Sequence, residues 1–387
     1  MRVILLTGKG GVGKTSLSLA TALGAAARGH RTFLLSTDPA HSLADAAGAK
    51  IGARPVRLAE RLVAQEVAVL EELDRSWAAI QSWLRELLRD EVDELVADEL
   101  LVFPGLEELI SLRAVREVEA TGEFDVCVVD CAPTGATLRM LRFPDALRIF
   151  MENFFDLERR GARLLRPLIE RVRGARRLLP REEFFDAFER LYRDVEDVRR
   201  ILLDGARTTA RLVLNPARVV VEETRRSFAY LSLYGVATDA VIVNRRLPRE
   251  ASEGFFARWA EREREEMAEI EGAFPIPILH APLFPHELVG LEPLRGLAAA
   301  VYEERDPAAV YTQARPIRLR KRGSRTLLEI DLPGASKEEV DVSVRGEDLF
   351  VRVRDAQRKI ALPASVAGRG VSSARLSDGV LEVVFEP

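Results

Sequence analysis

Glycine and lysine residues near the start of the chain are spaced as in a phosphate-binding loop. The stretch runs Gly8, Lys9, Gly10, Gly11, Val12, Gly13, Lys14, Thr15 and Ser16. Glycines let the backbone curl until successive N–H groups point at phosphate oxygens. Lys14 is expected to reach the β- and γ-phosphates of ATP, and the Thr15 hydroxyl to hold Mg²⁺. We therefore predict that this stretch, apart from Lys9, contacts the nucleotide.

The segments on both sides of the loop support this prediction. Residues 3–6 are predicted to form an apolar strand and residues 16–27 a helix, which is the context that such a loop requires. The positive end of that helix would add to the attraction for phosphate. A glycine-rich turn of chance origin is the alternative, and it would not need this context.

Lysine is rare in this chain, which makes the two lysines of the loop informative. Only six of the 57 lysines and arginines are lysines, and Lys9 and Lys14 are two of them. An ammonium is a compact point charge, whereas a guanidinium is too wide for a tightly wrapped loop. A second lysine at position 9 can neutralise a nucleotide held by a facing subunit, as a finger in trans does. This predicts a homodimer with catalytic roles for Lys9 and Lys14; a solvated Lys9 is the alternative.

Two aspartates follow predicted strands. Residues 31–37 lead to Asp38, and residues 124–129 lead to Asp130. Ligands of open parallel sheets bind outside the carboxyl ends of the strands, so both carboxylates are expected near the phosphates. Asp38 would orient or deprotonate the attacking water, and Asp130 would lie near Mg²⁺. Asp38 could also cap the helix expected after Pro39.

These segments together resemble two related groups of ATPases. The Lys9-bearing loop, the segment Asp38-Pro39-Ala40-His41-Ser42 and the segment from Asp130 to Arg139 are similar to the arsenite-pump ATPases and the ATPases of the tail-anchored protein targeting (Get/TRC) pathway. The resemblance covers about residues 1 to 305. It implies that Asp38 begins switch I and activates water, that residues 130–139 form switch II, and that nucleotide opens and closes the dimer.

The same resemblance implies where the adenine binds. Asn244 would contact adenine, and Pro282, Leu283 and Phe284 would form the loop beside it. The chain lacks the Cys-x-x-Cys pair with which Get-pathway ATPases hold zinc, so no zinc is expected. Its two cysteines are Cys127, which we interpret as core, and Cys131, a small switch residue; metal or redox use is the alternative. An arsenite-pump role is disfavoured for the same reason.

The middle of the chain is predicted to be helical. Apolar residues recur at helical spacing over 76–101, and further helices are expected over 140–203. A helical subdomain would thus occupy about 72–120 and 140–205, which in the family frames a groove for a hydrophobic client helix. Ordinary amphipathic packing is the alternative, and membrane-surface binding by the arginine-rich face is another.

Beyond residue 306 the pattern changes to alternation with a period of two. Strands are expected over 326–332, 340–345, 349–354 and 380–385, and residues 313–325 are a basic linker or a first strand. This predicts a small antiparallel sandwich. Its turn motifs resemble the α-crystallin (small heat-shock protein) domain, and the whole chain resembles Get-pathway paralogues with such an addition. The domain could also be a lid that only packs on the ATPase.

Composition sets the remaining bounds. With 387 residues, of which 47% are hydrophobic, two or three domains are expected: an ATPase domain over 1–310, a basic linker over 311–325 and an α-crystallin-like domain over 322–387. The net charge of −4 argues against nucleic acid as a partner. A strand that begins at Arg2 leaves no room for a signal peptide, and two cysteines fit a reducing compartment, so we expect a cytoplasmic protein with at most indirect or transient membrane contact.

The sequence thus predicts an α/β P-loop NTPase with a mostly parallel sheet and a helical insert, followed by an all-β sandwich. Its expected function is that of a dimeric, ATP-hydrolysing switch that binds hydrophobic or unfolded protein clients. A nucleotide-gated scaffold with an idle Asp38 is one alternative. A partitioning or positioning ATPase is another, although such proteins generally end in an amphipathic helix, where this chain has strands.

Overall fold

The computed structural model of the chain describes residues 1–38, 42–67, 106–132, 182–323, 325–363 and 365–386. Several expectations from the sequence therefore lie outside the described residues. They are the helices over 76–101, the part of 140–203 before residue 182, and the switch segments 39–41 and 133–139.

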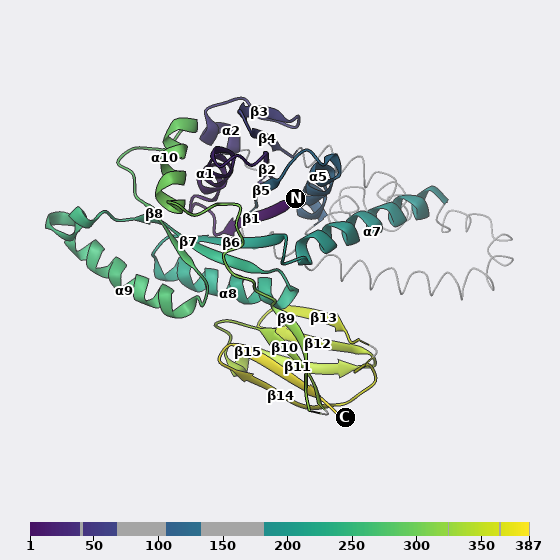
Figure 1. Cartoon of the computed structure of the whole chain (residues 1–387). Coiled ribbons are helices and arrows are strands. Elements are labelled where there is room, and N and C mark those ends of the chain that lie inside the picture. The colour runs from purple at the N-terminus through teal and green to yellow at the C-terminus, as the bar shows by residue number, and fades with distance from the viewer. Residues whose placement is uncertain (39–41, 68–105, 133–181, 324, 364, 387) are drawn as a thin grey trace, which may run out of the picture.

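An eight-stranded sheet forms the larger part of the molecule (Figure 1). Its strand order is β3-β4-β2-β5-β1-β6-β7-β8, and all pairs are parallel except β3 with β4. The strands are β1 (Arg2–Gly8), β2 (Thr32–Ser36), β3 (Val56–Ala59), β4 (Leu62–Glu66), β5 (Val126–Asp130), β6 (Thr208–Leu214), β7 (Thr238–Arg246) and β8 (Ile278–Pro282). The mostly parallel sheet expected from the sequence is confirmed.

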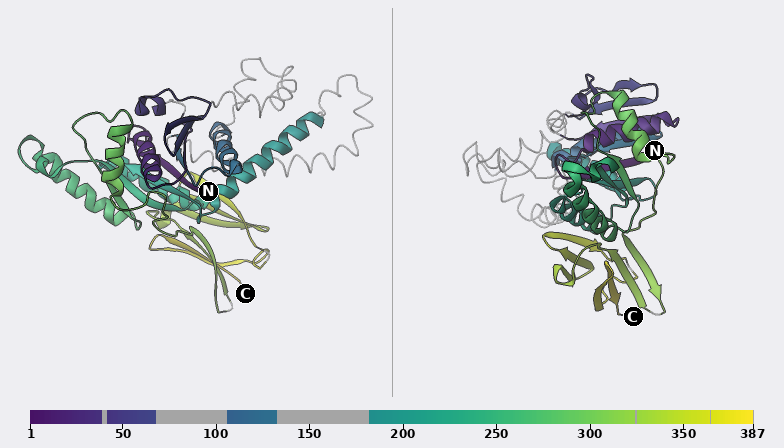
Figure 2. Two further views of the ribbon diagram at one scale, coloured as in Figure 1. Left: turned by 45° about the horizontal axis from the view of Figure 1, so that its top comes forward. Right: turned by 90° about the vertical axis from the view of Figure 1, so that its left-hand side faces the viewer.

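Helices cover both faces of this sheet (Figures 1 and 2). One face packs α1 (Lys14–Ala27), α2 (Ser42–Ala47) and α10 (Leu291–Tyr302); the other packs α5 (Leu106–Thr121), α7 (Glu182–Leu203), α8 (Arg218–Tyr234) and α9 (Ala257–Ala273). Strand β1 shows the division, because Val3 and Leu5 lie in one core while Ile4 and Leu6 lie in the other. Strands buried on both faces explain the nearly continuous apolar runs in the sequence.

The register of the central strands brings the predicted site residues to one edge. Leu6 of β1 and Ser36 of β2 are both opposite Asp130 of β5. The carboxyl ends of parallel strands share one edge of a sheet, so the loop after β1, the segment after β2 and Asp130 meet there.

The C-terminal part is a sandwich of two antiparallel sheets, drawn in yellow-green and yellow in Figure 1. One sheet has the order β14-β15-β10-β9 and the other β11-β12-β13. The strands are β9 (Ile317–Arg322), β10 (Arg325–Asp331), β11 (Val340–Arg345), β12 (Asp348–Val353), β13 (Ala356–Ala361), β14 (Val371–Ser377) and β15 (Val380–Phe385), with a 3-10 turn, η4, at Lys337–Glu339. The all-β sandwich is confirmed. Residues 313–325 were expected to be a basic linker or a first strand, and residues 317–322 of this segment form a strand.

Helix α8 joins the sandwich to the eight-stranded sheet. Tyr230, Leu233 and Tyr234 lie in the apolar core of the sandwich. A guanidinium N–H of Arg358 donates to the Leu233 carbonyl, and the Tyr234 hydroxyl donates to the carbonyl of Gln357. Helix α8 therefore packs on the eight-stranded sheet with one face and on the sandwich with its C-terminal part.

A buried ionic cluster fixes the chain segment between these two parts. The Arg211 and Asp239 side chains are fully buried, with Arg211 Nε 3.2 Å from Asp239 Oδ1, and Arg2 reaches the same carboxylate at 3.0 Å. Arg211 donates to the Ala309 carbonyl, and the Tyr311 N–H donates to Asp239. The connecting segment is thus tied to β1, β6 and β7.

Candidate functional site: a phosphate loop and its cleft

The loop between β1 and α1 is shaped by close backbone approaches. A Cβ on Gly13 would lie 2.3 Å from Nδ2 of Asn244, and one on Gly8 would lie 2.2 Å from the carbonyl oxygen of Val213. Gly11 and Gly13 have φ angles of 80° and 95°, which side chains rarely adopt. These positions require glycine, whereas a Cβ on Gly10 would meet open space.

Asn244 supports this loop from β7. Its Nδ2 donates to the Val12 carbonyl at 2.8 Å, and its Oδ1 accepts the Arg245 N–H at 2.9 Å. The Val12 side chain lies in the apolar core, so only its backbone is available to a ligand. Asn244 also lines the cleft described below, where it is placed to meet a nucleotide while it holds the loop.

Lys14 stands at the first position of α1, where the helix presents its free N–H groups. The side chain is buried, and its ammonium donates to the Lys9 carbonyl at 3.3 Å. No acidic residue occupies the first turn of α1, and its N-cap, Gly13, offers no side-chain cap. A cation and uncapped N–H groups at one helix end form a site for phosphate oxygens.

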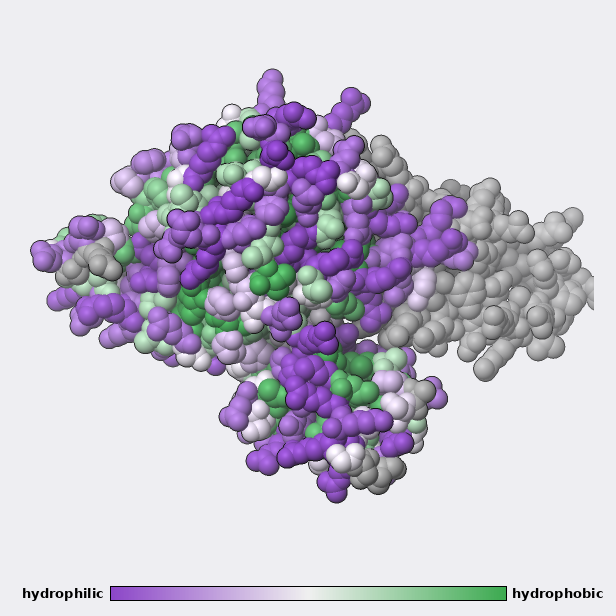
Figure 3. Space-filling model, viewed as in Figure 1, coloured by the Kyte–Doolittle hydropathy of each residue, from purple (hydrophilic) through white to green (hydrophobic). Residues whose placement is uncertain are grey.

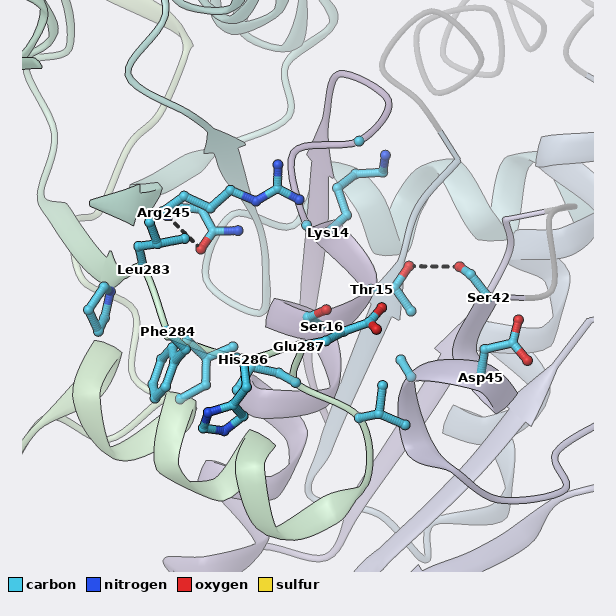
Figure 4. Close-up of a pocket in the computed structure, with 18 of the residues that line it drawn as sticks. Lys14, Thr15, Ser16, Ser42, Asp45, Arg245, Leu283, Phe284, His286 and Glu287 are labelled. Carbon is cyan, nitrogen blue, oxygen red and sulfur yellow. Dashed lines mark hydrogen bonds between the residues drawn. The ribbon is translucent and has the colours of Figure 1, made fainter. Parts of the chain in front are cut away.

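Hydroxyl groups surround the buried carboxylate of Asp130. Its Oδ2 accepts from Thr15 at 2.8 Å and from Ser36 at 3.4 Å, and its Oδ1 accepts from Ser18 at 3.1 Å. Thr15 Oγ1 also lies 3.0 Å from Ser42 Oγ, as the dashed line in Figure 4 shows. Burial raises the pKa of Asp130 to about 6, although the hydrogen bond from Thr15 and the charge of Lys14 lower it. The ionised form of Asp130 is therefore disfavoured, because water does not solvate the buried carboxylate.

Asp38 follows β2 and lines the same cleft. Its backbone N–H donates to Ser36 Oγ at 3.4 Å. The start of the helix that Asp38 was expected to cap, at residues 39–41, lies outside the described residues. Water activation and helix capping both need the Asp38 carboxylate at this edge of the sheet, and Asp38 lies there.

The cleft has a volume of about 680 Å³, within the range that small-molecule sites occupy. Its phosphate end is lined by Gly10, Gly11, Gly13, Lys14, Thr15, Ser16, Asp38 and Ser42, and its far end by Asn244, Arg245, Pro282, Leu283, Phe284 and His286. Figure 4 shows Leu283, Phe284 and His286 on one side of the opening and Thr15 and Ser42 on the other. One end of the cleft is thus lined by polar groups and the other by an apolar, partly aromatic wall. This arrangement suits the phosphate and base ends of a nucleotide.

Lys9 lies outside this cleft. Its ammonium is 3.1 Å from Oε2 of Glu223 on α8, and about 38% of the side chain is exposed. Neither Lys9 nor Gly8 is among the residues that line the cleft. The Lys9 ammonium therefore lies away from the cleft, although the Lys9 carbonyl accepts a hydrogen bond from Lys14.

Several residues of the site were missed by the sequence reasoning. Ser18 and Ser36 hydrogen-bond to Asp130, and Arg245 lines the cleft with a φ of 59°. The signal for Ser18 was present, because it lies three residues after Thr15 and so shares its helix face. Ser36 stands two residues before Asp38 but carries no motif of its own.

The sequence profile of the anion-transporting ATPases matches residues 1–303. The chain belongs to this family. A second profile, the HSP20-like domain found in ArsA proteins, matches residues 323–385. The resemblance inferred from the motifs is confirmed in both parts, and as a member of the anion-transporting ATPases the protein binds and hydrolyses ATP.

Relatives of the anion-transporting ATPase family match all or most of the chain. A protein of Prosthecochloris vibrioformis, provisionally named as an arsenical pump-driving ATPase, is 35% identical over 389 residues, which is 100% of this chain and 96% of that protein. ATPase get3 of Aspergillus terreus is 33% identical over 263 residues, which is 65% of this chain and 76% of that protein. The arsenical pump-driving ATPase of Acidiphilium multivorum is 31% identical over 306 residues, covering 76% of this chain and 48% of that protein.

Both cysteines of this family member are enclosed in the apolar core. Cys127 and Cys131 are free and buried. Burial raises the pKa of Cys127 to about 12 and that of Cys131 above its usual range. Burial therefore disfavours the thiolate, which is the form that binds metals.

In the described ranges, no helix combines the length and apolarity needed to cross a lipid bilayer.

Proposed function

We propose that this ATPase works as a Mg²⁺-dependent homodimer whose nucleotide state controls the binding of a hydrophobic or unfolded protein client. The observation that carries the dimeric part is the position of Lys9. It belongs to the phosphate loop, but its ammonium lies outside its own cleft and beside Glu223. An ammonium that points away from its own cleft supports a role on a triphosphate bound by another copy.

The residues at the phosphate end fit Mg²⁺. The hydroxyls of Thr15 and Ser42 and the carboxylate of Asp130 are hard oxygen donors within hydrogen-bonding reach of one another. No three His, Cys, Asp or Glu side chains gather as a metal cluster within the described residues, which suits an ion that takes most of its ligands from phosphate and water. When bound, Mg²⁺ would neutralise charge on the β- and γ-phosphates.

The remaining roles follow from the chemistry of each residue. Lys14, at the start of α1, binds phosphate oxygens, and the Lys9 of the facing copy adds a second positive charge. Asp38 orients or deprotonates the water that attacks the γ-phosphate. The apolar wall of Pro282, Leu283 and Phe284 receives the adenine, and Asn244 contacts its edge while holding the Val12 carbonyl.

The client-binding part of the proposal rests on the domain organisation. The helices expected between residues 72 and 205 and the HSP20-like domain over 323–385 add potential protein-binding surfaces to the ATPase. The name of the relative ATPase get3 agrees with the Get-pathway resemblance. We propose a protein client with an apolar segment rather than a metalloid.

Driving an arsenical pump is the second candidate, because two of the relatives carry that name. The cysteines argue against it. Both are buried, and their raised pKa values keep them as thiols. Arsenite binding to the isolated protein, measured by calorimetry, would reopen this candidate.

Mixing two inactive variants tests the dimeric mechanism. Lys9→Ala keeps an intact cleft but lacks the trans lysine, and Lys14→Ala has the reverse defect. Equimolar mixing is expected to restore up to about a quarter of wild-type turnover, because half of the dimers are mixed and each has one complete site. If the mixture stays as inactive as its components, the trans role of Lys9 is wrong.

Two further measurements test the other parts. Asp38→Asn is expected to lower turnover by at least about 100-fold with little change in nucleotide affinity; equal rates would indicate a scaffold with an idle Asp38. Co-expression with a tail-anchored apolar helix, followed by affinity capture with and without ATP, tests the client. Failure to capture it in any nucleotide state would contradict client binding.

A further inference from the structure

Three large aromatic side chains stand exposed together where α9 begins. Phe255 is 85% exposed, Phe256 52% and Trp259 64%. They belong to the short 3-10 turn η3 (Gly254–Phe256) and the first turn of α9, and the rings of Phe255 and Phe256 meet edge to face at 5.2 Å. Single exposed apolar residues are ordinary on protein surfaces, but adjacent aromatics are typical of the centres of interfaces.

This cluster is held firmly. The Glu263 carboxylate accepts the backbone N–H of Leu247 at 3.0 Å and also pairs with Arg246, which ties α9 to the end of β7. Met267 and Ile270, on the inner face of α9, are buried in the sheet core. The start of α9 lies at the left-hand tip of Figure 1. Its fixed support lowers the entropy lost when a partner binds the exposed aromatic rings.

The other exposed apolar residues of the described part gather at the same edge of the sheet. Val219 follows β6, the aromatic cluster follows β7, and Leu283 and Val289 follow β8. The phosphate loop follows β1 at this edge too, because all four strands are parallel. Only Val56 and Leu319, among the large exposed apolar residues of the described part, lie elsewhere.

We propose that Phe255, Phe256 and Trp259 form the apolar anchor of the homodimer interface, packing against a second copy of this chain. The inference rests on the proposed dimeric function. Lys9 needs a second copy at the carboxyl edge of the sheet, and the aromatic cluster is an uncovered apolar surface on that edge. A copy placed for Lys9 is therefore the partner nearest to these rings.

The charges around the cluster favour a second copy over a membrane. The exposed side of α9 near the rings carries both signs, with Arg258, Arg262 and Arg264 among Glu261 and Glu265. A self-complementary contact supplies each charge with an opposite one from the other copy. An anionic lipid surface would instead favour a face with one sign of charge.

The exposed aromatic area is large enough to form a substantial part of a dimer interface. At about 200 Å² per aromatic side chain, the three rings leave roughly 400 Å² exposed. Covering them in both copies removes about 800 Å² from water, which is about half of what a standard stable interface buries. The loops after β1, β6 and β8 lie at the same edge of the sheet and would supply the rest.

Sedimentation velocity of the full chain, with and without a non-hydrolysable ATP analogue, tests this anchor. The variant Phe255→Ser/Phe256→Ser/Trp259→Ser is expected to raise the dimer dissociation constant about 30-fold or more. Its turnover should fall at low protein concentration and recover at high concentration. The matched control Val56→Ser/Leu319→Ser removes exposed apolar side chains away from this edge and should associate like wild type. If the triple variant does not fold, Phe255→Ser alone should raise the dissociation constant at least threefold.

The outcomes separate this inference from the dimeric function itself. If the triple variant associates like wild type while the mixture of Lys9→Ala and Lys14→Ala regains activity, the dimer forms elsewhere and the anchor is wrong. If the variant still associates but no longer binds phosphatidylglycerol vesicles or the tail-anchored helix that wild type binds, the cluster is a membrane or client surface and the anchor is again wrong. A wild type that stays monomeric and shows no recovery on mixing contradicts the dimeric function as well.

Discussion

The ammonium of Lys9 lies 3.1 Å from Oε2 of Glu223, so the phosphate loop and α8 are joined by an ion pair. The same helix ends inside the core of the sandwich through Tyr230, Leu233 and Tyr234. One helix therefore contacts Lys9 near its start and the HSP20-like domain at its end.

The first prediction concerns this ion pair. In the proposed dimer, Lys9 would have to leave Glu223 to reach a nucleotide in the facing copy, so Glu223→Gln should favour nucleotide-dependent dimerisation. Both side chains are about one-third exposed, and pairs of this kind contribute about 1 kcal/mol or less. The expected gain in dimer affinity is therefore at most about fivefold, and it should shrink at high salt. Sedimentation at several salt concentrations measures it.

A neighbouring glutamate provides the control. Glu222 pairs with Arg225 on the same helix at 2.8 Å and does not contact Lys9. Glu222→Gln should leave dimerisation unchanged. Weaker association of Glu223→Gln would mean that Glu223 holds Lys9 in its working position rather than away from it.

The second prediction concerns pH and Asp130. Burial raises the pKa of this carboxyl to about 6, above the ordinary value of about 3.9 for Asp. The folded chain thus binds this proton more tightly than the unfolded chain, and the ionised carboxylate destabilises the fold above pH 6. Asp130→Asn should be more stable than wild type at pH 8 by on the order of 2 kcal/mol without metal, and the difference should vanish by about pH 4. Thermal unfolding in EDTA checks this.

Adding Mg²⁺ and nucleotide should reverse that order at pH 8. A cation compensates the ionised carboxylate, so wild type should gain melting temperature while Asp130→Asn gains much less. Chelation should return wild type to its lower value. Equal gains for both proteins would show that Asp130 does not take part in holding the cation.

The third prediction separates three glycines of the loop. Gly13→Ala places a methyl group against Asn244, at a φ of 95°, and should lower the melting temperature and abolish tight nucleotide binding. Gly11→Ala meets no atom but has a φ of 80°, which costs about 1–2 kcal/mol. Gly10→Ala meets open space at an ordinary φ and should change the unfolding free energy of the nucleotide-free chain by less than about 0.5 kcal/mol.

The phosphate loop was predictable from sequence because close backbone approach leaves glycine as the main choice and phosphate requires a compact cation. The partners of these residues were not. Glu223 is one of two adjacent, partly exposed glutamates on α8, and nothing local marks it rather than Glu222 as the residue facing Lys9. Likewise, Ser18 and Ser36 meet Asp130 only because β1, β2 and β5 are neighbours in the sheet.

Strand prediction in the sandwich succeeded where one face is apolar and failed at edges. Strands β11 and β15 have the predicted bounds, since their alternation is regular. Strand β13 was missed because Arg358 occupies an inward position, where its guanidinium donates to the Leu233 carbonyl of α8. Strand β14, at the edge of its sheet, is mostly exposed. Residues that pack on another domain do not follow the alternation of their own strand.

In Figure 3 the visible face of the sandwich is mostly hydrophilic, as edge and outer positions require.

The last prediction tests the buried cluster that fixes the connecting segment. Asp239→Ala leaves the fully buried guanidinium of Arg211 without its ion partner, and breaking a buried pair in this way costs about 3–5 kcal/mol. It also removes the acceptor of the Tyr311 N–H, so amide exchange over residues 306–311 should accelerate. The control Asp341→Ala removes an exposed pair with Arg352 and should cost less than about 1 kcal/mol. Urea unfolding and hydrogen exchange measure both effects. An Asp239→Ala protein within 1 kcal/mol of wild type, with unchanged exchange over 306–311, would mean that water or another group compensates Arg211 and that the segment is held by its other contacts.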